Sequence, residues 1–231
     1  MSLIAPSILS ADFARLGEAV AVAEKAGCGM LHVQVMDGHF VPDISVGPPV
    51  VESLRKATPL KLSVELLVER PERFIGDMAK AGADCIAIHA EATPDLDRAL
   101  EQTRAAQCQA GLALNPGTPI EAVAELLPKA NYLVILTANA GLGEPKFIEG
   151  MQGKVSRADE ERRRHGMSLE IVAAGGIGPV EADALTEAGA DILVVGTAIF
   201  NRQDGGAMLG RLVQRAGRPG GLGHGARSGL D

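Results

Sequence analysis

The sequence predicts a single (β/α)8 barrel, and three observations lead to this fold class. Short apolar runs alternate along the chain with amphipathic segments rich in Ala, Glu, Leu and Arg, an order that requires parallel strands joined by helical crossovers. Eight apolar runs fit into 231 residues, a length that suits one closed barrel. Three of the helical segments end in a shared Lys/Glu-Ala-Gly pattern directly before an apolar run.

The predicted strands are these apolar runs, and the predicted helices are the segments with apolar residues at helical spacing between them. The strands are placed at 3–9, 30–35, 60–67, 85–89, 109–114, 132–136, 169–173 and 192–195, and the helices at 15–26, 49–56, 71–81, 95–106, 120–127, 150–165 and 180–188. Gly27, Gly82 and Gly189 are the predicted C-terminal caps of three helices, because glycine adopts the left-handed cap conformation without strain. Residues 1–216 are predicted to form one barrel domain, and the glycine-rich segment 217–231 a flexible tail.

Composition excludes several classes of protein. Apolar residues make up 46% and charged residues 22% of the chain, which is typical of a soluble globular protein. With 22 basic against 29 acidic residues the net charge is −7, and no basic stretch is interleaved with aromatic residues, so nucleic acid is not an expected partner. The chain lacks an apolar run of about 18 residues and a basic leader, so we expect a cytoplasmic protein without a membrane partner. Cys28, Cys85 and Cys108 share no metal or redox spacing and are interpreted as reduced core thiols, with a reactive thiol as the alternative.

Polar side chains interrupt two neighbouring predicted strands at alternate positions. His32 and Gln34 share one face of the second strand, and Ser63 and Glu65 share one face of the third. Buried polar groups need partners, so these residues either face a ligand, the interpretation we favour, or form a closed polar plug. We expect burial to raise the pKa of Glu65 into a range suited to proton transfer.

Glycines follow the seventh and eighth strands at the point where a helix begins. Gly175 and Gly176 follow the seventh strand, and Gly196 and Thr197 follow the eighth. Backbone N–H groups exposed by glycine at this end of a barrel form the usual phosphate site of the fold. The alternative is that these glycines only permit the turn.

Two loops after predicted strands are longer than usual. The segment 139–147, with Gly141 and Gly143, has the composition of a loop that closes over a ligand, or of an ordinary surface connection. The segment 36–43 contains Asp37 and His39, which are either catalytic or hold the loop through side-chain to backbone hydrogen bonds.

The chain resembles the ribulose-phosphate 3-epimerase family at these same places. The resemblance rests on IAPSILSADF at 4–13, VMDGHFVP at 35–42, IHAE at 88–91, LNPGT at 114–118, Gly175-Gly176 and GTAIF at 196–200. It implies a TIM barrel that binds a phosphorylated ketopentose of the ribulose 5-phosphate and xylulose 5-phosphate class, in a protein that forms homo-oligomers. The residues expected to hold the phosphate are Gly141, Gly143, Gly175, Gly176, Gly196 and Thr197.

The resemblance also implies a metal site that this sequence has altered. Similar proteins hold one divalent Zn, Fe or Mn ion with two His and two Asp, and the two Asp act as acid and base. The corresponding positions here are His32, Gln34, Glu65 and Ala174, so three of the four are substituted. We therefore name no cofactor, and a residual metal site would have only His32 and Glu65 as ligands.

Two hypotheses about function follow. The first is an epimerase or isomerase of a phosphorylated ketose with a rearranged acid–base set, in which Glu65 and Asp37 are base and acid and His32 polarises the carbonyl. The second is a non-catalytic sugar-phosphate binder or regulatory subunit. In both, the expected substrate contacts are Ser7, His32, Gln34, His39 and Glu65.

Overall fold

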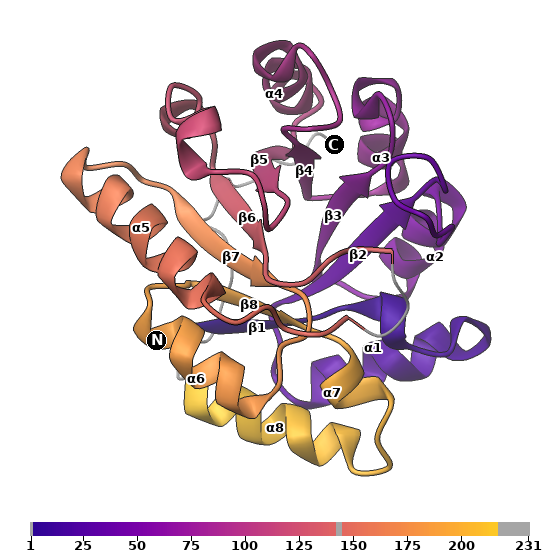
Figure 1. Ribbon diagram of the computed structural model, residues 1–231. Helices are drawn as coiled ribbons and strands as arrows, with labels where there is room; N and C mark the ends of the chain where they lie inside the picture. The colour runs from indigo at the N-terminus through magenta and orange to yellow at the C-terminus, as the bar shows by residue number, and fades with distance from the viewer. Residues whose placement is uncertain (1, 142–144, 217–231) are drawn as a thin grey trace.

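The computed structural model, which describes residues 2–141 and 145–216, contains an eight-stranded parallel barrel (Figure 1). The strands are β1 (Leu3–Pro6), β2 (Met30–Met36), β3 (Lys61–Leu67), β4 (Cys85–His89), β5 (Gln109–Leu114), β6 (Tyr132–Leu136), β7 (Glu170–Ala174) and β8 (Ile192–Val195). Each strand pairs with the next along the chain from β2 to β8, and β8 pairs with β1. A single parallel bridge between Ser7 and His32 connects the β1 end to β2. The predicted (β/α)8 fold class is confirmed.

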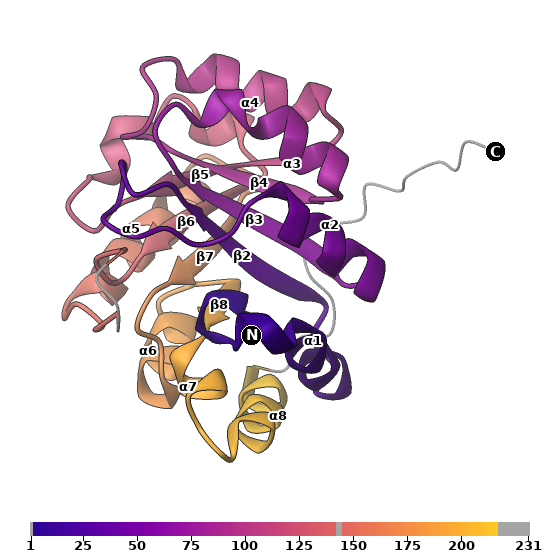
Figure 2. The ribbon, with the colours of Figure 1, turned by 90° about the vertical axis from the view of Figure 1, so that its right-hand side faces the viewer.

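The helices pack around the outside of the strands (Figures 1 and 2). They are α1 (Leu16–Lys25), α2 (Pro48–Ala57), α3 (Ile75–Ala81), α4 (Leu96–Ala105), α5 (Met151–Arg164), α6 (Pro179–Glu187), α7 (Thr197–Phe200) and α8 (Gly205–Ala216). The helices α7 and α8, which follow β8, were not predicted from the sequence. No helix of the described chain is long and apolar enough to cross a membrane. The predicted tail at 217–231 lies outside the described residues.

The predicted helix at 120–127 is wrong. The crossover from β5 to β6 instead contains the 3-10 turns Ile120–Val123 and Leu127–Lys129. Pro128 has no N–H for the carbonyl four residues earlier, and a segment this short forms too few α-helical hydrogen bonds to offset helix nucleation.

The glycine caps predicted from the internal repeat are confirmed. Gly27, Gly82 and Gly189 have φ of 80°, 105° and 103°, the left-handed region that favours glycine. In two copies of the repeat an aspartate two residues after the glycine also contacts the preceding strand in the sheet. Asp84 accepts a hydrogen bond from the Leu62 backbone, and Asp191 accepts one from the Ile171 backbone.

Two apolar cores position the site. The larger lies between the strands and the helices, and the smaller fills the barrel interior around Tyr132, which is fully buried. His32 and Gln34 alternate with outward-facing apolar residues on β2, so their side chains point into the interior as predicted. The three cysteines are buried and none of them forms a disulfide, and burial raises the pKa of Cys28 to about 12, which agrees with inert core thiols.

Candidate functional site

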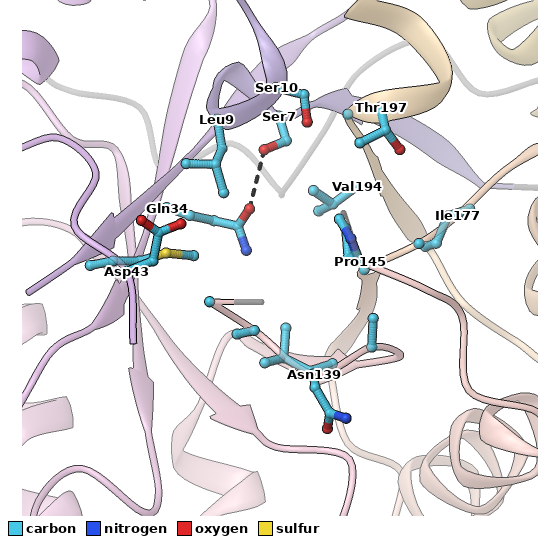
Figure 3. A pocket seen from close by; sticks show the side chains of 18 of the residues that line it. Ser7, Leu9, Ser10, Gln34, Asp43, Asn139, Pro145, Ile177, Val194 and Thr197 are labelled. Atoms are coloured by element: carbon cyan, nitrogen blue, oxygen red, sulfur yellow. Dashed lines mark hydrogen bonds between the residues drawn. The ribbon is translucent and has the colours of Figure 1, made fainter. Parts of the chain in front are cut away.

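A pocket of about 400 Å³ opens at the carboxyl ends of the strands (Figure 3). Its walls come from the ends of β1, β2, β6, β7 and β8 and from the loops that follow them. The polar or charged residues on these walls are Ser7, Ser10, Gln34, Asp43, Asn139, Thr197 and Asn201. Segments far apart in the sequence meet here because parallel strands bring all of their carboxyl ends to one face of a barrel.

The predicted phosphate residues line one side of this pocket. Gly141, Gly175, Gly176, Gly196 and Thr197 are all on its wall, while Gly143 lies outside the described residues. At Gly176, where φ is 66°, a Cβ atom would lie 2.4 Å from the backbone nitrogen of Phe147. At Gly196 a Cβ atom would lie 2.5 Å from the Ser10 hydroxyl oxygen. Glycine at both positions therefore lets the neighbouring residues approach the backbone more closely than a Cβ atom would permit.

Backbone N–H groups on this part of the wall make no hydrogen bond to any other residue that the structure describes. Within residues 2–141 and 145–216, the N–H groups of Gly176, Gly196 and Thr197 make no backbone or side-chain hydrogen bond. They lie beside one another at the ends of β7 and β8. A set of uncommitted amides is suited to an anion such as a phosphate group.

The wall of the pocket beside Gly196 carries a serine in contact with a glutamine, since the Cβ atom of Ser7 lies 3.4 Å from the place that a Cβ atom on Gly196 would take. The Ser7 hydroxyl donates to Gln34 Oε1 over 3.2 Å, and the dashed line in Figure 3 marks this bond. Gln34 Nε2 donates to Glu65 Oε2 over 3.0 Å, because β2 and β3 pair with Gln34 opposite Glu65. Gln34 therefore connects the pocket to the buried interior.

Behind Gln34 lies a closed network of fully buried ionisable groups. His32 Nε2 lies 3.0 Å from Glu65 Oε2, and His89 Nε2 lies 3.0 Å from Glu65 Oε1. None of the three side chains is more than 1% exposed, and none lines the pocket. His32 and Glu65 therefore form a closed polar cluster, the alternative to facing a ligand, whereas Gln34 faces the pocket.

The prediction of a raised pKa for Glu65 is wrong. Burial alone would raise the pKa of this carboxyl, but hydrogen bonds from His32 and His89, together with their charges, outweigh burial and lower it. Glu65 is therefore held as a carboxylate. The proposed role of Glu65 as a general base stays a prediction without support from the geometry.

His89, which the sequence analysis gave no role, completes this network. Its Nδ1 lies 3.3 Å from Glu91 Oε2 while its Nε2 faces Glu65, so both ring nitrogens face carboxylates and both donate. Burial would lower the pKa of His89, but the bonds to the two carboxylates raise it. Burial likewise opposes the shift at Glu91, whose pKa is lowered to about 2 by hydrogen bonds from His89, Thr118 and the Asn115 backbone. The only signal in the sequence was the strand-end motif IHAE at 88–91.

The chemistry of these donors does not fit a divalent metal. A metal needs lone pairs, whereas Nε2 of His32 and of His89 donate hydrogens to Glu65, and both lone pairs of Oε2 accept from His32 and Gln34. Ala174, at the fourth position, offers only a methyl group. Among the described residues no three His, Cys, Asp or Glu side chains converge as metal ligands.

Asp37 and His39 hold the loop after β2. Asp37 Oδ1 accepts from the backbone of His39 at 2.9 Å and of Phe40 at 3.0 Å, and its Oδ2 accepts from the backbone of Glu69 at 2.8 Å. Burial raises the pKa of Asp37, but these three backbone bonds outweigh it, so the pKa is lowered. Neither Asp37 nor His39 lines the pocket. These contacts agree with the alternative that the two residues hold the loop through side-chain to backbone hydrogen bonds. A catalytic role for either residue stays a prediction.

Asp43 is a carboxylate on the pocket wall that the sequence analysis missed. It lies in the loop after β2, is exposed, and accepts a hydrogen bond from the Ile44 backbone at 2.8 Å. Asp43 and Gln34 are both labelled on the pocket wall in Figure 3. The sequence offered no periodicity that could distinguish it from other loop aspartates.

The comparisons with known proteins show to which family this chain belongs. A model of the ribulose-phosphate 3 epimerase family matches residues 3–200. The chain belongs to this family. It is 41% identical over 207 residues to the ribulose-phosphate 3-epimerase of Bacillus subtilis, covering 88% of this chain and 94% of that protein. It is 42% identical over 204 residues to the chloroplastic ribulose-5-phosphate-3-epimerase of Arabidopsis thaliana, covering 87% of this chain and 73% of that protein.

Solved structures similar to this family member share its fold at low sequence identity. KGPDC from Streptococcus mutans superposes with a TM-score of 0.67 at 15% identity, covering 96% of this chain and all of that one (100%). The tryptophan synthase alpha-subunit of Pyrococcus furiosus gives a TM-score of 0.66 at 14% identity, covering 93% and 97% of the two chains. At these identities the likeness concerns the barrel alone. The family resemblance expected from the sequence motifs is confirmed by the family match.

Proposed function

We propose that this epimerase-family barrel binds a small phosphorylated ketose, of the ketopentose phosphate class, without a catalytic metal. The observation that carries the proposal is one pocket whose wall offers two unlike sets of polar groups. The first set is the N–H groups of Gly176, Gly196 and Thr197, which make no hydrogen bond within residues 2–141 and 145–216 and suit a phosphate group. The second set is Gln34 and Ser7, of which Ser7 lies beside Gly196, and this set suits sugar oxygens.

The same pocket argues against the two-carboxylate epimerisation that the resemblance implies. Inversion at a carbon next to a carbonyl removes a proton from one face of the substrate and returns one to the other, so it needs two groups of suitable pKa on opposite sides. The Gln34 amide and the Ala174 methyl group transfer no protons at neutral pH. Glu65 is fully buried and bonded to three donors, so it is also a poor proton acceptor.

Binding of phosphate to the glycine side is tested with two alanine variants that carry the same backbone strain. Gly176→Ala places a Cβ into Phe147 at a φ of 66°, whereas Gly166→Ala has a φ of 60° and nothing within 4 Å of the new atom. We expect Gly176→Ala to weaken binding of inorganic phosphate and of ribulose 5-phosphate at least about ten-fold, measured by calorimetry. Gly166→Ala should bind both as the unmodified protein does. Equal affinity in the two variants, or no binding to the unmodified protein, contradicts the proposal.

A second candidate function is proton transfer by Asp43, the one carboxylate that lines the pocket among the described residues. One carboxylate can move a proton along a single face of a substrate, which an aldose–ketose isomerisation requires and an epimerisation does not. The test is solvent deuterium exchange into ribulose 5-phosphate, followed by NMR. Exchange that Asp43→Asn abolishes, while the exposed Asp77→Asn leaves it intact, supports this function. Absence of exchange in the unmodified protein supports the binder.

A further inference from the structure

We propose that Glu65 is a positioning residue that fixes the polarity of the Gln34 amide, so that Gln34 presents an N–H donor to a carbonyl oxygen of the ligand. The inference rests on the proposed function, because it concerns Gln34 and Ser7 on the wall of the same pocket. It names the feature of the ligand that is recognised there. That feature is a carbonyl oxygen with a hydroxyl group on the adjacent carbon.

The contacts of Gln34 decide which way its amide points. A carboxylate only accepts hydrogen bonds, so the atom of Gln34 that lies 3.0 Å from Glu65 Oε2 is the nitrogen. The amide oxygen then faces the other way and accepts from the Ser7 hydroxyl at 3.2 Å. With the two ends reversed, the amide oxygen would lie against a carboxylate oxygen, a repulsive contact. The network behind Gln34 therefore sets the orientation in front of it.

The network behind Gln34 is itself fixed. Glu65 is 0% exposed and is held by His89 at 3.0 Å on Oε1 and by His32 at 3.0 Å on Oε2. His89 is in turn held by Glu91 at 3.3 Å. A buried carboxylate with donors on both oxygens has one favourable position, so its contact with Gln34 is the same in every molecule.

Two hydrogen-bonding sites then remain open towards the pocket. An amide nitrogen carries two hydrogens, and Glu65 accepts one, whereas the second meets no acceptor within the described residues. Ser7 Oγ donates its one hydrogen to Gln34 and keeps its lone pairs. A donor next to an acceptor complements a carbonyl oxygen next to a hydroxyl group. A phosphorylated ketose has this pair of groups, and no metal is required to recognise it.

Gln34→Glu removes the open donor with almost no change of shape. If the new carboxyl group is ionised it has no hydrogen to donate. If it is protonated, its single hydrogen is bound to Glu65, as the amide nitrogen was. In both states the pocket loses the donor, and the effects of the new carboxyl group that two ligands share cancel when their affinities for the same variant are compared. Gln34→Met, which removes the whole polar group, serves as a second variant if the carboxyl group disturbs folding.

The experiment measures dissociation constants by calorimetry with EDTA present, for ribulose 5-phosphate, ribitol 5-phosphate and inorganic phosphate. Ribitol 5-phosphate has a hydroxyl group in place of the carbonyl, and a hydroxyl group either accepts from an amide or donates to a carboxyl oxygen. We expect Gln34→Glu to weaken ribulose 5-phosphate binding about 3- to 12-fold relative to ribitol 5-phosphate, the loss typical of one hydrogen bond. Gln34→Met should weaken both ligands, and inorganic phosphate should bind each variant as it binds the unmodified protein.

The outcomes separate this inference from the proposed function. Equal losses for ribulose 5-phosphate and ribitol 5-phosphate in Gln34→Glu overturn the donor role of Gln34 while phosphate binding still stands. Failure of all three ligands to bind the unmodified protein overturns the proposed function itself. A ten-fold gain in ribulose 5-phosphate affinity when Mn²⁺ replaces EDTA overturns the metal-free recognition.

The role of Glu65 is tested separately with Glu65→Gln. An amide at this position offers both a donor and an acceptor, so Gln34 is free to point either way. We expect Glu65→Gln to bind inorganic phosphate as the unmodified protein does. When Gln34→Glu is added to Glu65→Gln, it should no longer change the ratio of ribulose 5-phosphate to ribitol 5-phosphate affinity, because the open donor is no longer fixed. If the ratio of ribulose 5-phosphate to ribitol 5-phosphate affinity still changes on Gln34→Glu in the Glu65→Gln background, Glu65 does not position Gln34.

Discussion

The buried contact between His89 and Glu65 leads to a prediction about stability whose size the structure sets. His89→Leu removes one donor from Glu65 Oε1 and leaves the carboxylate buried, with His32 and Gln34 still bonded to Oε2. Removing one partner of a buried ion pair costs about 3–5 kcal/mol, and because two donors remain we expect about 3 kcal/mol. In a chain of this length about 3 kcal/mol lowers Tm by about 10 °C.

His165→Leu is the matched control for this prediction. His165 contacts Glu161 at 2.9 Å through the same pair of atom types, but the two side chains are 52% and 31% exposed. An exposed pair of this kind contributes less than about 1 kcal/mol. Both variants are measured by urea unfolding at pH 7, with calorimetry to confirm the change in Tm. Equal losses of stability in the two variants would refute the argument that burial makes the His89 contact strong.

The pH dependence of stability gives a further check on the same pair. The pKa of His89 is raised on folding, so its contribution is complete below its ordinary pKa of about 6.5 and is lost as the pH rises through the folded value. The pKa of Glu65 is lowered on folding, so its contribution is present above about pH 4.5 and is lost as the pH falls through the folded value. The stability difference between the unmodified protein and His89→Leu should therefore be largest between about pH 4.5 and pH 6.5.

Two other predictions concern packing and charge. Gly111→Ala places a Cβ atom 2.2 Å from the Tyr132 ring, so we expect a loss of about 1–3 kcal/mol in urea unfolding, whereas Gly117→Ala, with nothing within 4 Å, should change stability by less than about 1 kcal/mol. Burial lowers the pKa of Lys154 to about 8, so between about pH 8 and pH 10.5 the unfolded chain binds the extra proton and this lysine makes stability rise with pH. Lys154→Met should remove that rise, and an unchanged slope in this window would contradict the lowered pKa.

Much of this molecule follows from local sequence pattern. The alternation of apolar runs and amphipathic segments predicts parallel strands joined by helical crossovers, and eight such runs in 231 residues predict the barrel. The caps at Gly82 and Gly189 follow from the left-handed backbone that ends a helix. The glycines at 175, 176 and 196 could be assigned to one pocket from the sequence, because a barrel gathers all of its strand ends on one face.

The properties of the polar residues did not follow from pattern. Alternation shows that Glu65 points inward, but its pKa depends on His32 and His89, which lie on the two strands that pair with its own. Burial and a charged partner shift a carboxyl pKa in opposite directions, so its sign was undetermined until the partner was known. Asp43 was missed because a loop residue reaches the pocket through the path of its backbone, for which the sequence has no periodic signal.

The sequence by itself determined the order of strands and helices, the glycine turns at the strand ends and the family. Only the tertiary structure decided which inward polar groups face the pocket and which face one another. Local backbone preferences act over a few residues and can be read in order along the chain. Ionisation and hydrogen-bond polarity depend on atoms about 3 Å apart in space, and those atoms come from strands whose register is fixed only when the barrel closes.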